Sequence, residues 1–143
     1  GLGMTAVGTL SKASLDSRKS KVGCRVYAAG IPRVGQELAD DESHIANFTT
    51  LRQLLSAPEI LEIWPVGSRG ILAEGCDLAA AAGGTLQLEP DITSALDLHK
   101  SAGPCTTLLF STRLGEYDFT QENLNVPINT IGTIVPLKET SPR

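Results

Sequence analysis

The middle of the chain reads Pro65-Val66-Gly67-Ser68-Arg69-Gly70 and leads directly into Ile71-Leu72-Ala73-Glu74-Gly75-Cys76-Asp77-Leu78-Ala79. The apolar residues before this loop, 60–66, predict a strand, and the alanine-rich residues 71–82 predict a helix that ends at Gly83-Gly84. A small-residue loop between a strand and a helix is typical of an anion site, because the first helical turn leaves N–H groups unpaired. The alternative is a tight turn without a ligand, in which Ser68 is the N-cap and Arg69 points to solvent.

A second polar loop, residues 97–104, precedes the apolar residues 105–111, which predict the clearest strand in the sequence. His99, Lys100 and Ser101 lie on this loop. Their imidazole, ammonium and hydroxyl groups suit a phosphate or a sugar, and loops carry such groups when a rigid scaffold positions them. A polar turn without a ligand is the alternative here as well.

Arg33 follows another predicted strand and lies between two glycines, Gly30 and Gly35. It could meet an anionic ligand or pair with a surface carboxylate. We expect the loops that carry Arg69 and Lys100 to open onto one shared hollow on the same side of the molecule.

The remaining apolar segments predict a sheet with few helices. Strands are expected at 4–10, 25–30, 60–66, 85–88, 105–111 and 130–136, and a short helix is expected to begin with a capping box at Thr50–Gln53. Because strands outnumber helices and only some are separated by helix-length connections, we predict an α+β fold with helices packed on a mixed, largely antiparallel sheet.

Composition narrows the classes of function. The chain has 143 residues and a net charge of −4, and it lacks a long basic stretch, which argues against a nucleic-acid partner. No apolar run approaches the roughly 20 residues of a membrane helix, and no secretory leader is seen, so we expect no membrane association and a cytoplasmic location. The three cysteines are widely spaced, which argues against a metal site built from them. The acidic run 40–42 fits a solvated turn, so we predict no metal site there either.

Several of these segments together resemble the C-terminal domain of the aminoimidazole ribonucleotide synthetase (AIR synthase-related) superfamily. The resemblance lies in the segments 4–8, 26–30 with its continuation 32–35, and 131–136. Within the superfamily, residues 65–71 and 97–104 are most similar to the branch that contains α-ribazole kinase, an enzyme of cobalamin-precursor salvage.

The resemblance implies a two-domain protomer. In the family an N-terminal domain dimerises and holds ATP and Mg through acidic residues, and the C-terminal domain closes over the cleft. Nothing in residues 1–143 resembles that N-terminal half, so we expect a single C-terminal domain with a tail at 137–143, excised from a longer protein and catalytically silent alone. Its expected partner is its own N-terminal domain, in a homodimer.

The expected role of this domain is to orient a small phosphorylated or nucleoside-like substrate for an ATP-dependent kinase. The domain itself is expected to bind neither ATP nor a metal and to contribute no catalytic residue. The alternative is a stand-alone, non-catalytic ligand-binding or regulatory module with the same fold. The residues expected to bind substrate or phosphate are Arg33, Gly67, Ser68, Arg69, Gly70, His99, Lys100 and Ser101.

Overall fold

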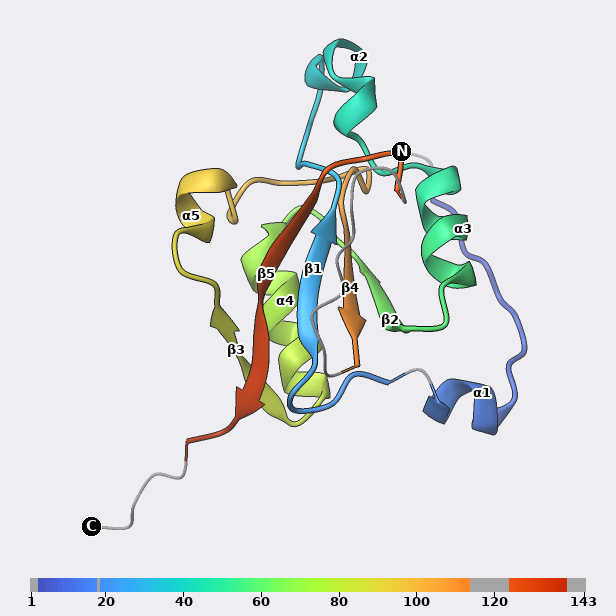
Figure 1. The fold of residues 1–143 in the computed structure, drawn as a ribbon. Helices are drawn as coiled ribbons and strands as arrows, with labels where there is room; N and C mark the ends of the chain where they lie inside the picture. The colour runs from blue at the N-terminus through green and yellow to red at the C-terminus, as the bar shows by residue number, and fades with distance from the viewer. Residues whose placement is uncertain (1–2, 18, 114–123, 139–143) are drawn as a thin grey trace.

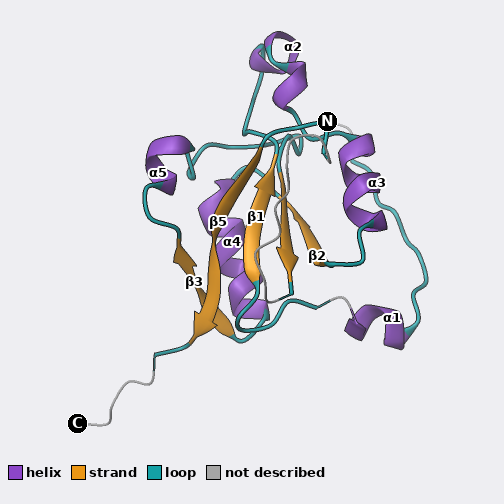
Figure 2. Ribbon diagram, in the orientation of Figure 1, coloured by secondary structure: helices purple, strands orange, loops and turns teal. Residues whose placement is uncertain are grey.

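The frame of the molecule is a five-stranded sheet (Figures 1 and 2). The computed structural model describes residues 3–17, 19–113 and 124–138. The strand order is β2-β4-β1-β5-β3, and each of these neighbouring pairs is antiparallel. The predicted α+β class with a largely antiparallel sheet is therefore confirmed. The strands are β1 (Arg25–Ala29), β2 (Ile60–Pro65), β3 (Gly84–Leu88), β4 (Leu108–Thr112) and β5 (Ile128–Pro136).

One face of the sheet is covered by the longest helix of the described residues, which Figure 1 shows behind the strands. Ile71, Leu78 and Ala79 of this helix are fully buried in the core on this face. A Cβ added at Gly75 would lie 2.9 Å from Leu86 Cδ2, so the glycine allows the helix to approach β3 closely. The helix is α4 (Gly70–Ala81), within one residue of the predicted range.

The opposite face has its own core, because successive side chains of a strand point to opposite faces. Val26 and Ala28 of β1 lie in the first core, whereas Tyr27 and Ala29 lie in the second. There the Tyr27 ring stacks on Phe110 of β4 with ring centroids 5.3 Å apart. The sheet is thus buried on both faces along its central strands.

The helix α3 (Phe48–Ser56) flanks β2 and contributes buried Leu54 to the second core. Its N-cap is Asn47, whose side chain accepts the Thr50 N–H while the Thr50 hydroxyl accepts the Asn47 N–H. The prediction of a capping box at Thr50–Gln53 is therefore wrong in position. The remaining short helices are α1 (Lys12–Ser17), α2 (Glu37–Asp40), the 3-10 turn η1 (Glu42–His44) and α5 (Ile92–Ala95).

The predicted strand at residues 4–10 is wrong. The structure gives this segment no regular secondary structure, and its side chains are exposed, Met4 and Val7 by more than nine-tenths. Its apolar and β-branched composition resembles a strand, but a strand forms only where a neighbour completes its hydrogen bonds. The predicted tail begins with exposed Leu137 and continues into residues 139–143, which lie outside the described part.

None of the helices in the described part of the chain has the length and apolar character needed to cross a bilayer. Among the same residues, no three His, Cys, Asp or Glu side chains are grouped so that they could hold a metal ion.

Candidate functional site

The predicted site residues gather at one end of the sheet. β1 and β2 are both antiparallel to β4 and so run in the same direction. Arg33 follows β1, residues 67–70 follow β2, and residues 99–101 precede β4. The topology therefore brings three loops that are far apart in the sequence to the same end of the sheet.

Two of these loops touch through their backbones. Gly70 has a φ of +82°, and a Cβ there would lie 2.8 Å from both the His99 carbonyl carbon and the Leu98 oxygen. The Leu72 N–H donates to the Leu98 oxygen (2.9 Å), and the Ala102 N–H donates to the Gly67 oxygen (3.0 Å). The start of α4 and the loop before β4 thus form one continuous unit.

The Arg69 side chain is folded back onto its own helix. Its Nη2 lies 2.6 Å from Asp77 Oδ2 and 3.1 Å from Glu74 Oε2, although the side chain is 57% exposed. The hydrogen bond with Asp77, followed by the charges of Asp77 and Glu74, raises the pKa of Arg69. Trp64 Nε1 also donates to Glu74 Oε2 at 3.1 Å, which places the only tryptophan beside this cluster.

Ser68 is exposed, and it is not the N-cap of α4. The N-cap position is Arg69, and no side chain there accepts a hydrogen bond from the first turn. The alternative in which Ser68 caps the helix is therefore wrong, because the helix begins one residue further along, at Gly70.

The Arg33 guanidinium is paired with Asp41, through Nε at 2.8 Å and Nη2 at 2.6 Å from Oδ2. The other Asp41 oxygen contacts His44 Nδ1. The hydrogen bond with His44, and then that with Arg33, lowers the pKa of Asp41 below its usual value. The Arg33 main chain is anchored too, since its N–H donates to Thr106 Oγ1 at 3.0 Å.

Lys100 reaches across to another loop. Its Nζ lies 2.6 Å from Glu37 Oε1, and this hydrogen bond is the main cause of the lowered pKa of Glu37. The loop conformation is set by Asp97, whose Oδ1 accepts the N–H groups of His99 (3.0 Å) and Lys100 (3.1 Å). Ser101 Oγ accepts the Gly103 N–H at 3.3 Å.

The sequence interpretation missed Asp97 and Glu37. An aspartate two residues before a polar turn is a recognisable signal, because its side chain can bond the backbone ahead of it. Glu37 has no such signal, since it lies 63 positions from Lys100.

Three cations therefore lie at this end of the sheet, each held by a carboxylate of the chain. An incoming anion would compete with these carboxylates for the side chains. At the start of α4, the Gly70 and Leu72 N–H groups already donate to the Gly67 and Leu98 oxygens. The positive end of the α4 dipole is the other source of attraction for an anion.

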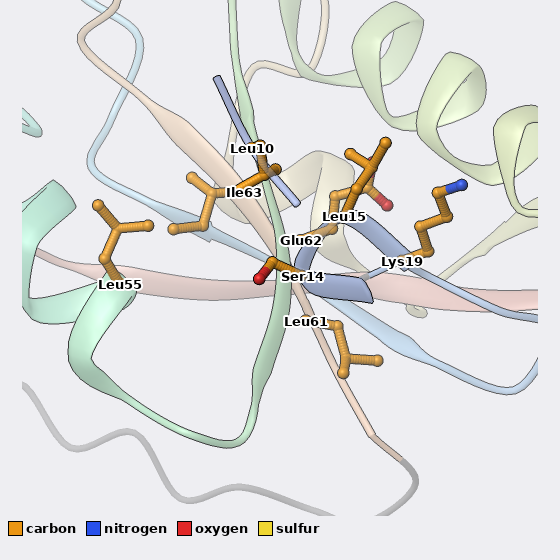
Figure 3. A pocket seen from close by; sticks show the side chains of 8 residues that line it. All are labelled: Leu10, Ser14, Leu15, Lys19, Leu55, Leu61, Glu62 and Ile63. Atoms are coloured by element: carbon orange, nitrogen blue, oxygen red, sulfur yellow. The ribbon is translucent and has the colours of Figure 1, made fainter. Parts of the chain in front are cut away.

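Two hollows stand out on the described part of the chain, and neither is lined by Arg69 or Lys100. Neither is therefore the shared hollow that we expected between their loops. One, of about 290 Å³, is lined by residues 93–99 and includes His99. The other, of about 670 Å³, lies near α1 and β2, away from the predicted site (Figure 3). Its lining is mainly apolar: Leu10, Ser14, Leu15, Lys19, Leu55, Leu61, Glu62 and Ile63.

Comparison with known proteins bears on the fold alone. No protein-family model matches the sequence, and no curated protein matches it by sequence. The structure is similar to E. coli HypE, a hydrogenase maturation protein, with a TM-score of 0.59 and 14% identity over 85% of this chain. The match spans 46% of HypE, so the chain corresponds to about half of that protein's length. At this identity the comparison shows that the chain shares the fold of the matched part of HypE.

Proposed function

We propose that this chain is the substrate-side domain of an ATP-dependent small-molecule kinase with an AIR synthase-like fold, the acceptor being α-ribazole or a similar nucleoside-like compound. The observation that carries the proposal is the direct backbone contact between Gly70 and the loop of His99 and Lys100. This contact brings the loop that carries a hydroxyl, an imidazole and an ammonium group beside the N-terminus of a twelve-residue helix.

A phosphate at this position would lie near the positive end of the α4 dipole, which favours an anion. Ser68 and Ser101 would donate hydroxyl hydrogen bonds to it. Arg69 would leave Asp77 and Glu74 to contact the ligand. Breaking these ion pairs would cost little free energy, because exposed ion pairs contribute little to stability.

Phosphoryl transfer depends mainly on positioning and on neutralising charge. Those are the tasks that Arg33, Arg69 and Lys100 would perform, by orienting the substrate rather than by reacting with it. We therefore assign no catalytic residue to this chain.

Two acidic residues beside the candidate site, Asp41 and Glu37, already have partners within the chain. Asp41 is paired with Arg33 and His44, and Glu37 is paired with Lys100. We assign ATP and Mg to a separate N-terminal domain of the complete protein, which would also form the homodimer. HypE, about twice as long as the matched region, shows that this fold occurs within a longer chain.

The binding test uses Trp64 as a reporter, because its N–H shares Glu74 with Arg69. Titration with inorganic pyrophosphate should shift the emission as Arg69 moves. Arg69→Ala should weaken the affinity by roughly tenfold, the effect of losing one charge-assisted contact. Calorimetry measures the affinity of both proteins, because Trp64 cannot report the movement of Arg69 in a variant that lacks it.

Arg52→Ala is the matched control, since this exposed arginine lies on α3. Equal affinity for the wild type and for Arg69→Ala would exclude Arg69 from the site. A turnover assay with ATP and nucleosides separates the kinase proposal from the alternative: a complete protein that binds the ligand without ATP turnover would be a non-catalytic binding module, and turnover by the isolated chain would contradict a half-enzyme.

A further inference from the structure

A protruding segment, residues 31–46, stands over the end of the sheet that carries the candidate site. We call this segment the strap. It contains α2 and η1, and Figure 1 shows α2 standing away from the strands. Neither α2 nor η1 has a buried residue, so hydrophobic burial does little to fix the position of these two elements.

The base of the strap is firmly held. The Ile31 N–H donates to the His44 oxygen (2.8 Å), which joins the two ends, and Ala46 N–H donates to the Thr106 oxygen (2.9 Å). Thr106 is 1% exposed and also accepts the Arg33 N–H through its hydroxyl. A Cβ at Gly30 would lie 2.5 Å from the Thr106 oxygen, so backbone packs tightly at this point.

The tip of the strap, residues 34–43, is held differently. Gly35 has a φ of +59° and no atom within 4 Å of its Cβ position, so nothing packs against the chain there. The hydrogen bonds of the tip are mostly local: the Val34 N–H donates to Glu37 Oε2 (3.0 Å), and the Leu38 N–H donates to the Gly35 oxygen (3.2 Å). Asp41 adds an ion pair with Arg33 at the base.

One ion pair connects the tip to a distant part of the chain. Lys100 Nζ lies 2.6 Å from Glu37 Oε1, and Lys100 is the neighbour of His99, whose backbone packs on Gly70. The side chains are 27% and 44% exposed, so the pair is accessible to solvent. The same lysine is thus a contact of the strap and a member of the candidate anion site.

We propose that the strap is a hinged lid and that the Lys100–Glu37 ion pair is the latch that holds its tip down. Its use as a gate rests on the proposed function: an anion that takes Lys100 away from Glu37 releases the tip. Ligand binding and lid opening then share one side chain.

Hydrogen exchange of the amides of residues 34–43 tests the latch without any ligand. Lys100→Met and Glu37→Gln should each speed exchange about two- to fivefold, the range expected for an accessible ion pair. The β1 amides serve as an internal reference and should not change. Lys138→Met removes the same charge from an exposed site near the end of β5 and is the matched control.

A charge reversal distinguishes a latch from a general effect of substitution. Exchange in the double variant Glu37→Lys with Lys100→Glu should be slower than in either single reversal. The latch is refuted if Lys100→Met exchanges like Lys138→Met, or if the effects of the two reversals simply multiply.

Inorganic pyrophosphate tests the gate. Binding reported by Trp64 together with faster exchange at residues 34–43 supports it, and binding with unchanged exchange refutes it. If pyrophosphate does not bind, the proposed function fails and the gate fails with it, whereas the latch is decided by the variants alone.

Discussion

Gly70 is the residue on which the contact between the two polar loops depends. Its φ of +82° lies in the region that L side chains rarely adopt, and the His99 backbone occupies the space a side chain would need. The sequence shows a glycine in a loop, which predicts an anion site or, as the alternative, a tight turn. The close approach of another backbone was not predictable, because the approaching residues lie about thirty positions further along the chain.

Gly70→Ala should lower the free energy of unfolding by about 3 kcal/mol, since it combines backbone strain with a clash against rigid backbone. Gly83→Ala is the matched control: its φ is +80°, but nothing lies within 4 Å of the Cβ position. It should cost only the strain, about 1 kcal/mol. Urea unfolding of both variants measures the difference, and equal losses would show that the contact with His99 adds nothing.

The ion-pair partners of the three basic residues in the candidate site were also beyond prediction from the sequence. Composition and position identified Arg33, Arg69 and Lys100, and topology places all three at one end of the sheet. The partner of Lys100 was not predictable from the sequence, because Glu37 comes from a separate loop. Glu74 and Asp77 lie five and eight positions from Arg69, outside the i,i+3 and i,i+4 spacing of paired helix side chains, so local spacing did not indicate these partners either.

Among the elements, α4 was predicted within one residue, and the N-cap of α3 was predicted three residues late. Alanine-rich periodicity and the glycines after it define α4 from local sequence alone. The start of α3 depends on Asn47, whose side chain accepts the Thr50 N–H. Thr50 was interpreted as the first residue of a capping box, whereas it provides the reciprocal hydroxyl.

Asn47→Ala should lower the free energy of unfolding by about 1 kcal/mol, because the Thr50 N–H at the start of α3 loses its side-chain acceptor. Asn47→Asp keeps an acceptor oxygen at the same place and should retain most of the stability. Thermal unfolding followed by circular dichroism gives both values. A loss no larger for alanine than for aspartate would mean that the cap does not stabilise α3.

At the scale of the whole molecule, the sheet separates two cores that meet only through its strands. Phe110 is fully buried on the α3 side and stacks on Tyr27, while Leu109 beside it is fully buried on the α4 side. Both cores therefore depend on the same central strands, and we expect them to unfold together.

Phe110→Ala should cost about 3–5 kcal/mol, the range for removing a large buried aromatic side chain. If the cores are coupled, near-ultraviolet and far-ultraviolet circular dichroism should follow one transition in urea. Phe48→Ala is the control, because Phe48 is 73% exposed and its loss should change stability little. Two separate transitions in Phe110→Ala would show instead that each face folds independently.

The sequence by itself determined the α+β class, the main strands, the helix α4 and the polar loops that follow or precede the strands. These features depend on local periodicity and on glycine positions, which act over a few residues. Only the tertiary structure decided that residues 4–10 are not a strand, that the two loops share a backbone contact and that Lys100 holds Glu37. Each of these depends on which distant segment lies alongside, and burial and hydrogen bonding between remote residues are set by the assembled sheet, not by local pattern.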